Sequence, residues 1–458
     1  MIAVPSLAGT IAAVMGLGRS GRATALALAA SGAVVRAWDD DSGKRDAALA
    51  EGLTLADPLT GGLDGCALLV WSPGIPHTYP APHPVAQAAA ARGIPMVCDV
   101  ELLGRARPDC QFLAITGTNG KSTTTTLLGH IAQGCGLSSA AGGNLGTAAL
   151  AMPELDPGGT YVMELSSYQI ELLDSIQLDV AVLLNITPDH LARHGGIEGY
   201  VAAKRRLFRY LKPGHAAIVG MDDPTCRGVL MAILAASRWH AVGISAERRV
   251  PGGVYAPDGV LIDDTENDAV PCLDLREIAS LPGRHNWQNA CAAFAAARHA
   301  GMDPDEICEA LSTYPGLAHR QELVGTVNGV LYVNDSKATN ADAAEKALVC
   351  YQDVYWIAGG QPKEGGIDAL ERHFGRIRHA FLIGEAAQAF GRRLDGKVAF
   401  TQCGDLGTAV ARAHAMAQAE RVAGAVVLLS PACASWDQFA SFEQRGDVFR
   451  QLVREVAA

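Results

Sequence analysis

The sequence predicts an α/β protein made of three successive α/β blocks with mainly parallel sheets. Short apolar runs alternate with helix-like segments along the 458 residues, which is typical of parallel strands joined by crossover helices. Glycine-containing turns follow several of these runs, and the turn at residues 117–120 resembles a phosphate-binding loop in composition. We place the blocks at residues 1–100, 101–316 and 317–458.

The first block pairs a glycine-rich turn with a downstream acidic cluster. Apolar runs at 11–15, 34–38, 68–71 and 95–97 predict strands, and residues 84–92 predict a helix. Gly16, Gly18 and Gly21 follow the first run, and Asp39 opens three consecutive aspartates after the second. This spacing matches the dinucleotide-binding fingerprint, although the same arrangement also serves other nucleotides, including UDP-linked ones.

The middle block carries the phosphate-binding candidate. A buried strand that begins at Phe112 leads into Gly117-Thr-Asn-Gly120, after which Lys121 and Ser122 open a helix. Backbone N–H groups at such a turn bind phosphate, lysine adds a positive charge, and a hydroxyl of Ser122 or Thr123 can reach Mg²⁺. The stricter motif has a glycine where this chain has Ile115. A plain strand-to-helix turn is the alternative, but strand, turn, lysine and hydroxyl together favour a nucleotide triphosphate site.

Two further strands of this block end in polar residues. The run 161–163 delivers Glu164, a candidate metal ligand, and the run 180–184 leads to Asp189 and His190. Ligands of open α/β sheets bind outside the carboxyl ends of the strands, so these residues are expected on the rim that holds the loop. His190 could bind a metal, position a substrate or pair with Asp189, and spacing alone favours a structural role. Lys204 lies in a helix-like run at 200–208, and composition alone places it on the solvent-facing side.

The third block repeats the alternation, with strands expected at 330–333, 354–358, 380–383 and 425–429. Lys337 follows the first of these and is suited to binding a carboxylate as a fixed charge. Thr339 and Ser435 have the alternative role of helix caps, and Phe442 that of a core residue.

Composition excludes several classes of protein. The net charge is −11 and no Lys/Arg block is present, which argues against nucleic acid as a partner. No apolar run reaches the roughly 18 to 20 residues of a membrane-spanning helix, and the N-terminus lacks the pattern of a signal peptide. The eleven cysteines are scattered without C-x-x-C spacing, which predicts reduced thiols in a cytoplasmic protein and no zinc site.

Taken together, these motifs resemble the Mur ligase family of peptidoglycan synthesis, over the full length of the chain. The matching stretches are TGTNGKSTTT at 116, GGNLG at 142, MELSSYQIE at 163, NITPDHLARH at 185, GRHNWQNA at 283, LAHRQE at 317, NDSKATN at 334, GGQPK at 359 and SPACASWDQFASFEQRG at 430. The NDSKATN and SPACASWDQF stretches are similar to those of the family's D-glutamate-adding members.

The resemblance implies three Rossmann-like domains, which bind in order a UDP-linked substrate, ATP, and the incoming amino acid. It implies that ATP phosphorylates the carboxylate of UDP-N-acetylmuramoyl-L-alanine, and that the amine of D-glutamate attacks the resulting acyl phosphate. It further implies a cytoplasmic enzyme, and we expect a monomer.

The resemblance also assigns roles to individual residues. The expected catalytic residues are Lys121, Glu164, His190 and Lys204. Two Mg²⁺ ions would be held by Ser122, Glu164, His190 and a carbamylated Lys204. ATP would contact Gly117, Thr118, Asn119, Gly120, Lys121, Ser122, Thr123, Asn286, Asn289, Arg320 and Asp335. The UDP-linked substrate would contact Gly18, Arg19, Ser20, Asp39, Ser72 and Asn144, with the choice among Asp39, Asp40 and Asp41 left open. D-glutamate would contact Lys337, Thr339, Lys363, Ser435 and Phe442.

Three alternatives compete with this interpretation. One is another amide ligase of the superfamily, such as a folate polyglutamate synthase, against which the first block's fingerprint argues. The second is an oxidoreductase that uses the turn at residue 16 and Asp39, which leaves the loop at 117 unexplained. The third is a nucleotide-binding regulator without turnover.

Overall fold

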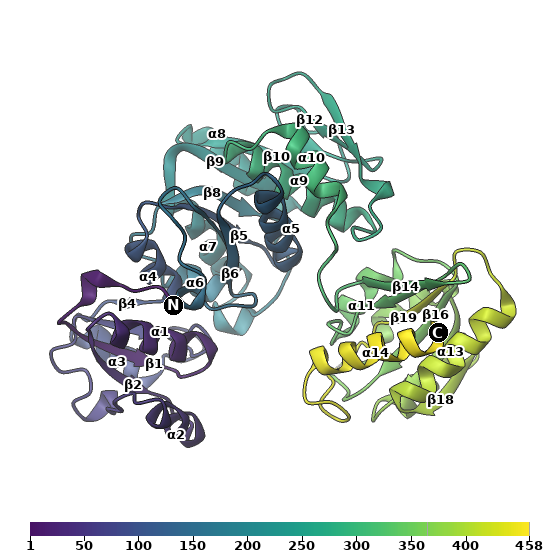
Figure 1. The fold of residues 1–458 in the computed structure, drawn as a ribbon, viewed down its shortest axis with the longest axis horizontal. Helices are drawn as coiled ribbons and strands as arrows, with labels where there is room; N and C mark the ends of the chain where they lie inside the picture. Colours follow the sequence, from purple (N-terminus) through teal and green to yellow (C-terminus); the bar gives the residue numbers. More distant parts are fainter. Residues whose placement is uncertain (364, 458) are drawn as a thin grey trace. The chain divides into compact units, whose positions relative to one another are not determined.

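The computed structural model describes residues 1–363 and 365–457. Its strands form three sheets, and parallel pairs predominate in each, which confirms the predicted fold class (Figure 1). Each sheet lies within one of the three predicted blocks. Contacts between Cα atoms divide the chain into two compact units: unit 1 comprises Met1–Leu275 and Asn286–Thr313, and unit 2 comprises Arg276–His285 and the residues from Tyr314 onward. The division into three domains stays a prediction.

The first sheet is fully parallel, with strand order β2-β1-β3-β4. Alanine-rich helices and short connections surround it, and its buried strands form one core with the neighbouring part of unit 1. The elements are β1 Ile11–Met15, α1 Arg19–Ala30, β2 Val34–Trp38, α2 Ser42–Ala50, β3 Leu68–Trp71, α3 Pro84–Ala91 and β4 Met96–Val97.

The second sheet has nine strands in the order β13-β12-β11-β10-β9-β8-β5-β7-β6. β5 lies between β7 and β8, so the ends of these three strands meet at one edge. The elements are α4 Asp99–Ala106, β5 Gln111–Thr116, α5 Lys121–Gly134, β6 Ser139–Gly143, β7 Thr160–Glu164, α6 Ser167–Glu171, β8 Leu178–Leu183, α7 Ile197–Arg205, β9 Leu211–Gly220, α8 Pro224–Ala236, β10 His240–Ser245, β11 Val254–Tyr255, β12 Val260–Asp263, β13 Val270–Asp274, α9 Arg284–His299 and α10 Pro304–Ser312.

The third sheet has the order β14-β15-β19-β16-β17-β18, and only its first pair is antiparallel. Apolar clusters pack on both faces of its central strands. The elements are β14 Glu322–Val327, β15 Val330–Asn334, α11 Ala341–Leu348, β16 Val354–Gly359, β17 Ile377–Ile383, α12 Ala387–Leu394, β18 Phe400–Gly404, α13 Leu406–Glu420, β19 Val426–Leu429 and α14 Phe442–Ala457.

One predicted helix differs from the structure. The helix expected over residues 200–208 ends at Arg205, and a tighter 3-10 helix continues over Arg206–Tyr210. The Tyr210 hydroxyl donates to Leu173 O at 2.5 Å, and Arg206 Nε donates to that hydroxyl at 3.2 Å. These contacts hold the tighter turn, and they depend on a part of the chain more than thirty residues away.

All eleven cysteines are free thiols, as their scattered spacing predicts. Among the described residues, no helix has the length and apolar character needed to cross a bilayer.

Candidate active site

The phosphate-binding candidate is a tight loop between β5 and α5. Asn185, just after β8, fixes the loop: its main-chain oxygen accepts from Thr118 N at 2.9 Å, and its side-chain Oδ1 accepts from Asn119 N at 2.8 Å. α5 begins after Gly120 without a side-chain cap, so the amides of its first turn face the loop. Backbone amides at such a helix start favour a bound anion.

Gly120 is packed directly against α9. Its φ of +85° is unfavourable for other residues, and a Cβ added here would lie 2.3 Å from Asn289 Oδ1. Asn289 donates in turn to Asn286 Oδ1 at 3.2 Å. The structure therefore brings both predicted adenine-side asparagines next to the loop.

We expect Gly120→Ala to raise the KM for ATP by at least about tenfold, because the new methyl group must displace Asn289 or the loop itself. The measurement is ATP-dependent phosphate release at varied ATP. Gly136→Ala is the matched control, since Gly136 has a φ of +74° and open space around its Cα. It carries the same backbone cost of roughly 1 kcal/mol without the clash. Equal KM values for the two variants would contradict the assigned role of the close contact.

Two lysines converge on the carbonyl groups of the loop. Lys121 Nζ donates to Gly117 O at 3.0 Å and to Thr118 O at 2.9 Å, and Lys204 Nζ donates to Gly117 O at 2.9 Å. Lys204 is only 1% exposed, so it does not lie on the solvent-facing side of its helix as composition alone suggested. Burial, together with the nearby charge of Lys121, lowers the pKa of Lys204 to about 7.

Glu164 ends β7 beside the loop strand, paired in register with Ile115 of β5. It is 3% exposed, and its Oε1 accepts from Asn144 Nδ2 at 2.8 Å. Its Oε2 is buried and has no hydrogen-bond partner among the described residues. A buried carboxylate oxygen without a partner is costly, and a cation would satisfy it.

The loop after β8 places His190 next to aromatic and charged groups. His190 has a φ of +51°, lies 3.4 Å from Asp189 Oδ2, and its ring centroid is 5.4 Å from that of Tyr168. Partial burial lowers the pKa of His190. The Asp189 carboxylate acts to raise this pKa and the Lys121 charge to lower it, and the net shift is downward. His190 is therefore mainly neutral near pH 7, with a ring nitrogen able to accept a proton or bind a metal.

The same loop reaches the first sheet. Arg193 stacks on the Tyr168 ring at 4.5 Å and donates to Gly74 O at 2.9 Å, two residues after Ser72. Arg19, at the start of α1, donates to Asn144 O at 3.3 Å. The junction of the first two sheets is therefore lined by Ser72, Asn144 and the glycine turn that contains Gly18 and Ser20.

The three aspartates after β2 have different partners. Asp39 is buried and accepts from Leu17 N at 2.6 Å and from Asp41 N at 2.9 Å, and these amides lower its pKa despite the opposing effect of burial. Asp40 contacts His83 at 3.0 Å, and Asp41 caps α2. Asp39 thus shapes the glycine turn, and its contact with uracil stays a prediction.

A second group of predicted residues meets in unit 2, at the ends of β15 and β19. Lys337 Nζ lies 3.8 Å from the centroid of the Phe442 ring. Ser435 is buried in the loop after β19, and neighbouring Ala434 pairs with Gln361, two residues before Lys363. Thr339 N donates to Lys337 O at 2.8 Å. These loops thus lie side by side.

Asp335 lies beneath this group. Its Oδ2 accepts from Ser430 Oγ at 2.7 Å, and its Oδ1 accepts from Gln321 N at 3.2 Å, next to Arg320. Burial raises the pKa of Asp335 to about 7. Arg320 and Asp335 are therefore neighbours, and their contact with ATP stays a prediction.

The sequence assignment missed Arg445, a buried guanidinium that joins the loops of unit 2. It is 1% exposed and donates to Ser336 Oγ at 2.9 Å, Ser336 O at 2.8 Å, Cys433 O at 3.2 Å and Ala434 O at 3.3 Å. It therefore links the segment of Lys337 to the segment of Ser435. The signal in the sequence was its place in the stretch SFEQRG, three residues after Phe442.

We expect Arg445→Met to lower the free energy of unfolding of unit 2 by about 3 kcal/mol, because it leaves buried carbonyls without donors. Urea unfolding monitored by fluorescence measures this. Arg454→Met is the control, because Arg454 is exposed on the same helix. The account of Arg445 fails if both variants unfold at the same urea concentration.

Comparison with known proteins places this arrangement in a family. Residues 115–297 match the model of the Mur ligase middle domain. The chain is 62% identical to a protein of Paramagnetospirillum magneticum over 99% of its own length and 98% of the relative's, and 55% identical to one of Rhodospirillum rubrum over 100% and 97%. The chain therefore belongs to the Mur ligase family, as the motifs predict.

Both relatives are named UDP-N-acetylmuramoylalanine--D-glutamate ligase. Among solved structures, the UDP-N-acetylmuramate-alanine ligase of Thermotoga maritima matches with a TM-score of 0.57 and 16% identity, over 97% of this chain and 99% of that one. At that identity the match supports the fold alone, and it agrees with the multi-sheet α/β architecture.

Proposed function

We propose that this chain is an ATP-dependent ligase that adds D-glutamate to UDP-N-acetylmuramoyl-L-alanine. The observation that carries the proposal is full-length identity of up to 62% to relatives named for that reaction. The reaction needs a site for ATP and a site for an amino acid. The phosphate loop beside Glu164 in unit 1 supports the first, and Lys337 in unit 2, which can bind a carboxylate, supports the second. The oxidoreductase alternative accounts for neither group.

ATP would bind at the loop. The amides of residues 117–123 and the Lys121 ammonium would hold the β- and γ-phosphates, and Asn286 and Asn289 would face the adenine side. Arg320 and Asp335 of unit 2 are the remaining residues that we propose as ATP contacts. Lys121 would release the loop carbonyls it now contacts and bind the phosphate instead.

The residues present fit Mg²⁺. Glu164 Oε2 is a buried acceptor that has no hydrogen-bond partner among the described residues, and Ser122 lies in the first turn of α5. Mg²⁺ in such sites binds through one or two carboxylates together with substrate phosphates, so a cluster of three ligating side chains is not required. The described residues contain no such cluster. When bound, the ion would offset the charge on the transferring phosphoryl group.

Carbamylation of Lys204 is the finer part of the proposal. With a pKa of about 7, much of this amine is neutral in the cytoplasmic pH range. The nitrogen lone pair can then attack the carbon of CO₂, forming an N–C bond, moving one C=O electron pair onto oxygen, and releasing a proton. The resulting carbamate, with His190 nearby, would hold a second Mg²⁺.

Each substrate would have its own group of contact residues. The UDP-linked substrate would contact Gly18, Arg19, Ser20, Asp39, Ser72 and Asn144. D-glutamate would contact Lys337, Thr339, Lys363, Ser435 and Phe442. Phosphorylation of the L-alanyl carboxylate makes one oxygen a good leaving group. The amine can then attack the carbonyl carbon, and phosphate departs from the tetrahedral intermediate. We further propose that the enzyme acts as a monomer in the cytoplasm.

The test is the amino-acid dependence of phosphate release. With ATP and UDP-N-acetylmuramoyl-L-alanine present, we expect D-glutamate to support release far better than L-glutamate, L-alanine or L-lysine. Release that is equal with any of these, or that needs no amino acid, would overturn the assignment. Release without the UDP-linked substrate would favour another amide ligase.

A further inference from the structure

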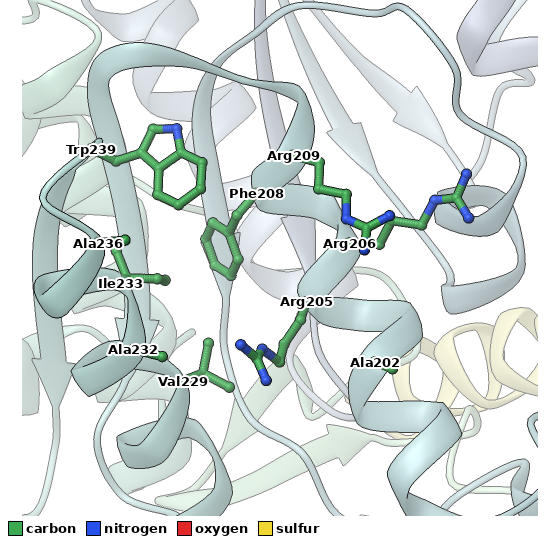
Figure 2. Close-up of a pocket in the computed structure, with 10 residues that line it drawn as sticks. All are labelled: Ala202, Arg205, Arg206, Phe208, Arg209, Val229, Ala232, Ile233, Ala236 and Trp239. Atoms are coloured by element: carbon green, nitrogen blue, oxygen red, sulfur yellow. The ribbon is translucent and has the colours of Figure 1, made fainter.

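Unit 1 contains a cavity that combines arginines with apolar side chains. It has a volume of about 390 Å³ and lies between α8 and the segment formed by α7 and the 3-10 helix Arg206–Tyr210. Arg205, Arg206 and Arg209 form its charged wall, and Phe208, Ile233 and Trp239 contribute apolar surface (Figure 2). This volume is within the range of small-molecule sites.

Two of these arginines have no partner among the residues that the structure describes. Arg206 donates to Tyr210 OH and to Leu173 O, at 3.2 and 3.5 Å. In the described part of the chain, Arg205 and Arg209 form neither an ion pair nor a hydrogen bond. In a chain of net charge −11, two such arginines on the wall of a partly apolar cavity favour a bound anion there.

The apolar part of the wall is held in place. Trp239 Nε1 donates to Leu211 O at 3.1 Å, which fixes the orientation of the indole ring. Phe208 and Ile233 are buried residues that line the cavity. Figure 2 shows the Arg205 guanidinium extending towards Val229 of α8.

This cavity is distinct from the candidate active site. Lys204 and Arg205 are neighbours in α7, but the Lys204 side chain is buried and contacts Gly117, whereas Arg205 is exposed and lines the cavity. None of the residues expected to bind ATP, metal or substrate lines it.

We propose that this cavity binds a small amphipathic anion, with an aromatic or aliphatic body and a phosphate or carboxylate head. The body would pack against Phe208, Ile233 and Trp239, where it is removed from water. The head would accept hydrogen bonds from Arg205 and Arg209, whose planar guanidinium groups suit both anions. The apolar wall alone would accept an apolar ligand, and the arginines alone would accept a simple anion. Their combination favours a ligand that has both an apolar body and an anionic head.

The test is calorimetric titration of the full-length protein with 1-naphthyl phosphate. We expect saturable binding that is weakened at least about tenfold in the double variant Arg205→Gln/Arg209→Gln. The control is Arg392→Gln/Arg412→Gln, which removes two exposed arginines of unit 2, and it should bind as the wild type does. Equal affinity in the two double variants would overturn the proposal, because the probe would then bind elsewhere.

Two further probes distinguish the source of the anion. Inorganic phosphate should bind at least about tenfold more weakly than 1-naphthyl phosphate, because it makes no use of the apolar wall. Equal binding would indicate an adventitious ion site only, and would overturn the proposal. The proposal would also be overturned if the protein bound phosphatidylglycerol vesicles but showed no saturable binding of free 1-naphthyl phosphate, since the surface would then recognise a membrane.

Discussion

Lys121→Ala is expected to lower ATP-dependent phosphate release by at least about 100-fold, the scale on which single groups stabilise developing charge. Lys121 lies at the start of α5, and its ammonium is within 3.0 Å of the loop carbonyls. Removing it takes away the positive charge that would neutralise the γ-phosphate during transfer. The measurement is phosphate release at saturating ATP, UDP-N-acetylmuramoyl-L-alanine and D-glutamate.

Binding of the UDP-linked substrate should survive this change, because its proposed contacts come mainly from the first sheet. Titration of UDP-N-acetylmuramoyl-L-alanine into the variant checks this point. Lys397→Ala is the control, since Lys397 is exposed and paired with Glu371 on the surface of unit 2. Near-normal phosphate release by Lys121→Ala would remove the loop from the catalytic site.

Lys204→Ala should also lose about 100-fold or more in activity, but short carboxylic acids should restore part of it. Alanine leaves a buried space where the carbamate would lie, and acetate or formate can place a carboxylate there. We expect about a tenfold recovery at saturating acid. Activity at a series of acetate concentrations measures it, and the recovery should saturate.

The control for this rescue is Lys121→Ala under the same conditions. Acetate should not restore the activity of Lys121→Ala, because this variant has lost a positive charge, which a carboxylate cannot replace. Full activity of Lys204→Ala without acid would contradict the carbamate, as would recovery of both variants to the same extent.

The sequence predicted much of the fold because its strands are short apolar runs that end in distinctive polar residues. The strands at 11–15, 34–38 and 68–71 have the predicted bounds, and Glu164 lies at the end of β7 as expected. The antiparallel strands β11 to β13 were not predicted. They are short, and partly exposed in β12 and β13, so they lack the continuous apolar pattern of the central strands.

The parts of the site that sequence could not predict depend on contacts between distant segments. Burial of Lys204 results from the packing of α7 against the phosphate loop, and a helix-like run with three basic residues gives no sign of it. Asn185 and Arg445 act by holding other loops in place. Both lie in stretches that match the family, but the segments they hold, at Asn119 and Ser336, are far away in the sequence. Lys121 is identifiable because the glycine turn next to it has a chemical meaning.

The central claim is that the loop at Gly117 transfers the terminal phosphoryl group of ATP to a carboxylate. The most direct test uses UDP-N-acetylmuramoyl-L-alanine with both L-alanyl carboxylate oxygens labelled with ¹⁸O. After turnover with unlabelled ATP and D-glutamate, mass spectrometry should find one ¹⁸O in each released phosphate, because that oxygen bridged carbon and phosphorus in the acyl phosphate. Amide product accompanied by unlabelled phosphate would contradict the account.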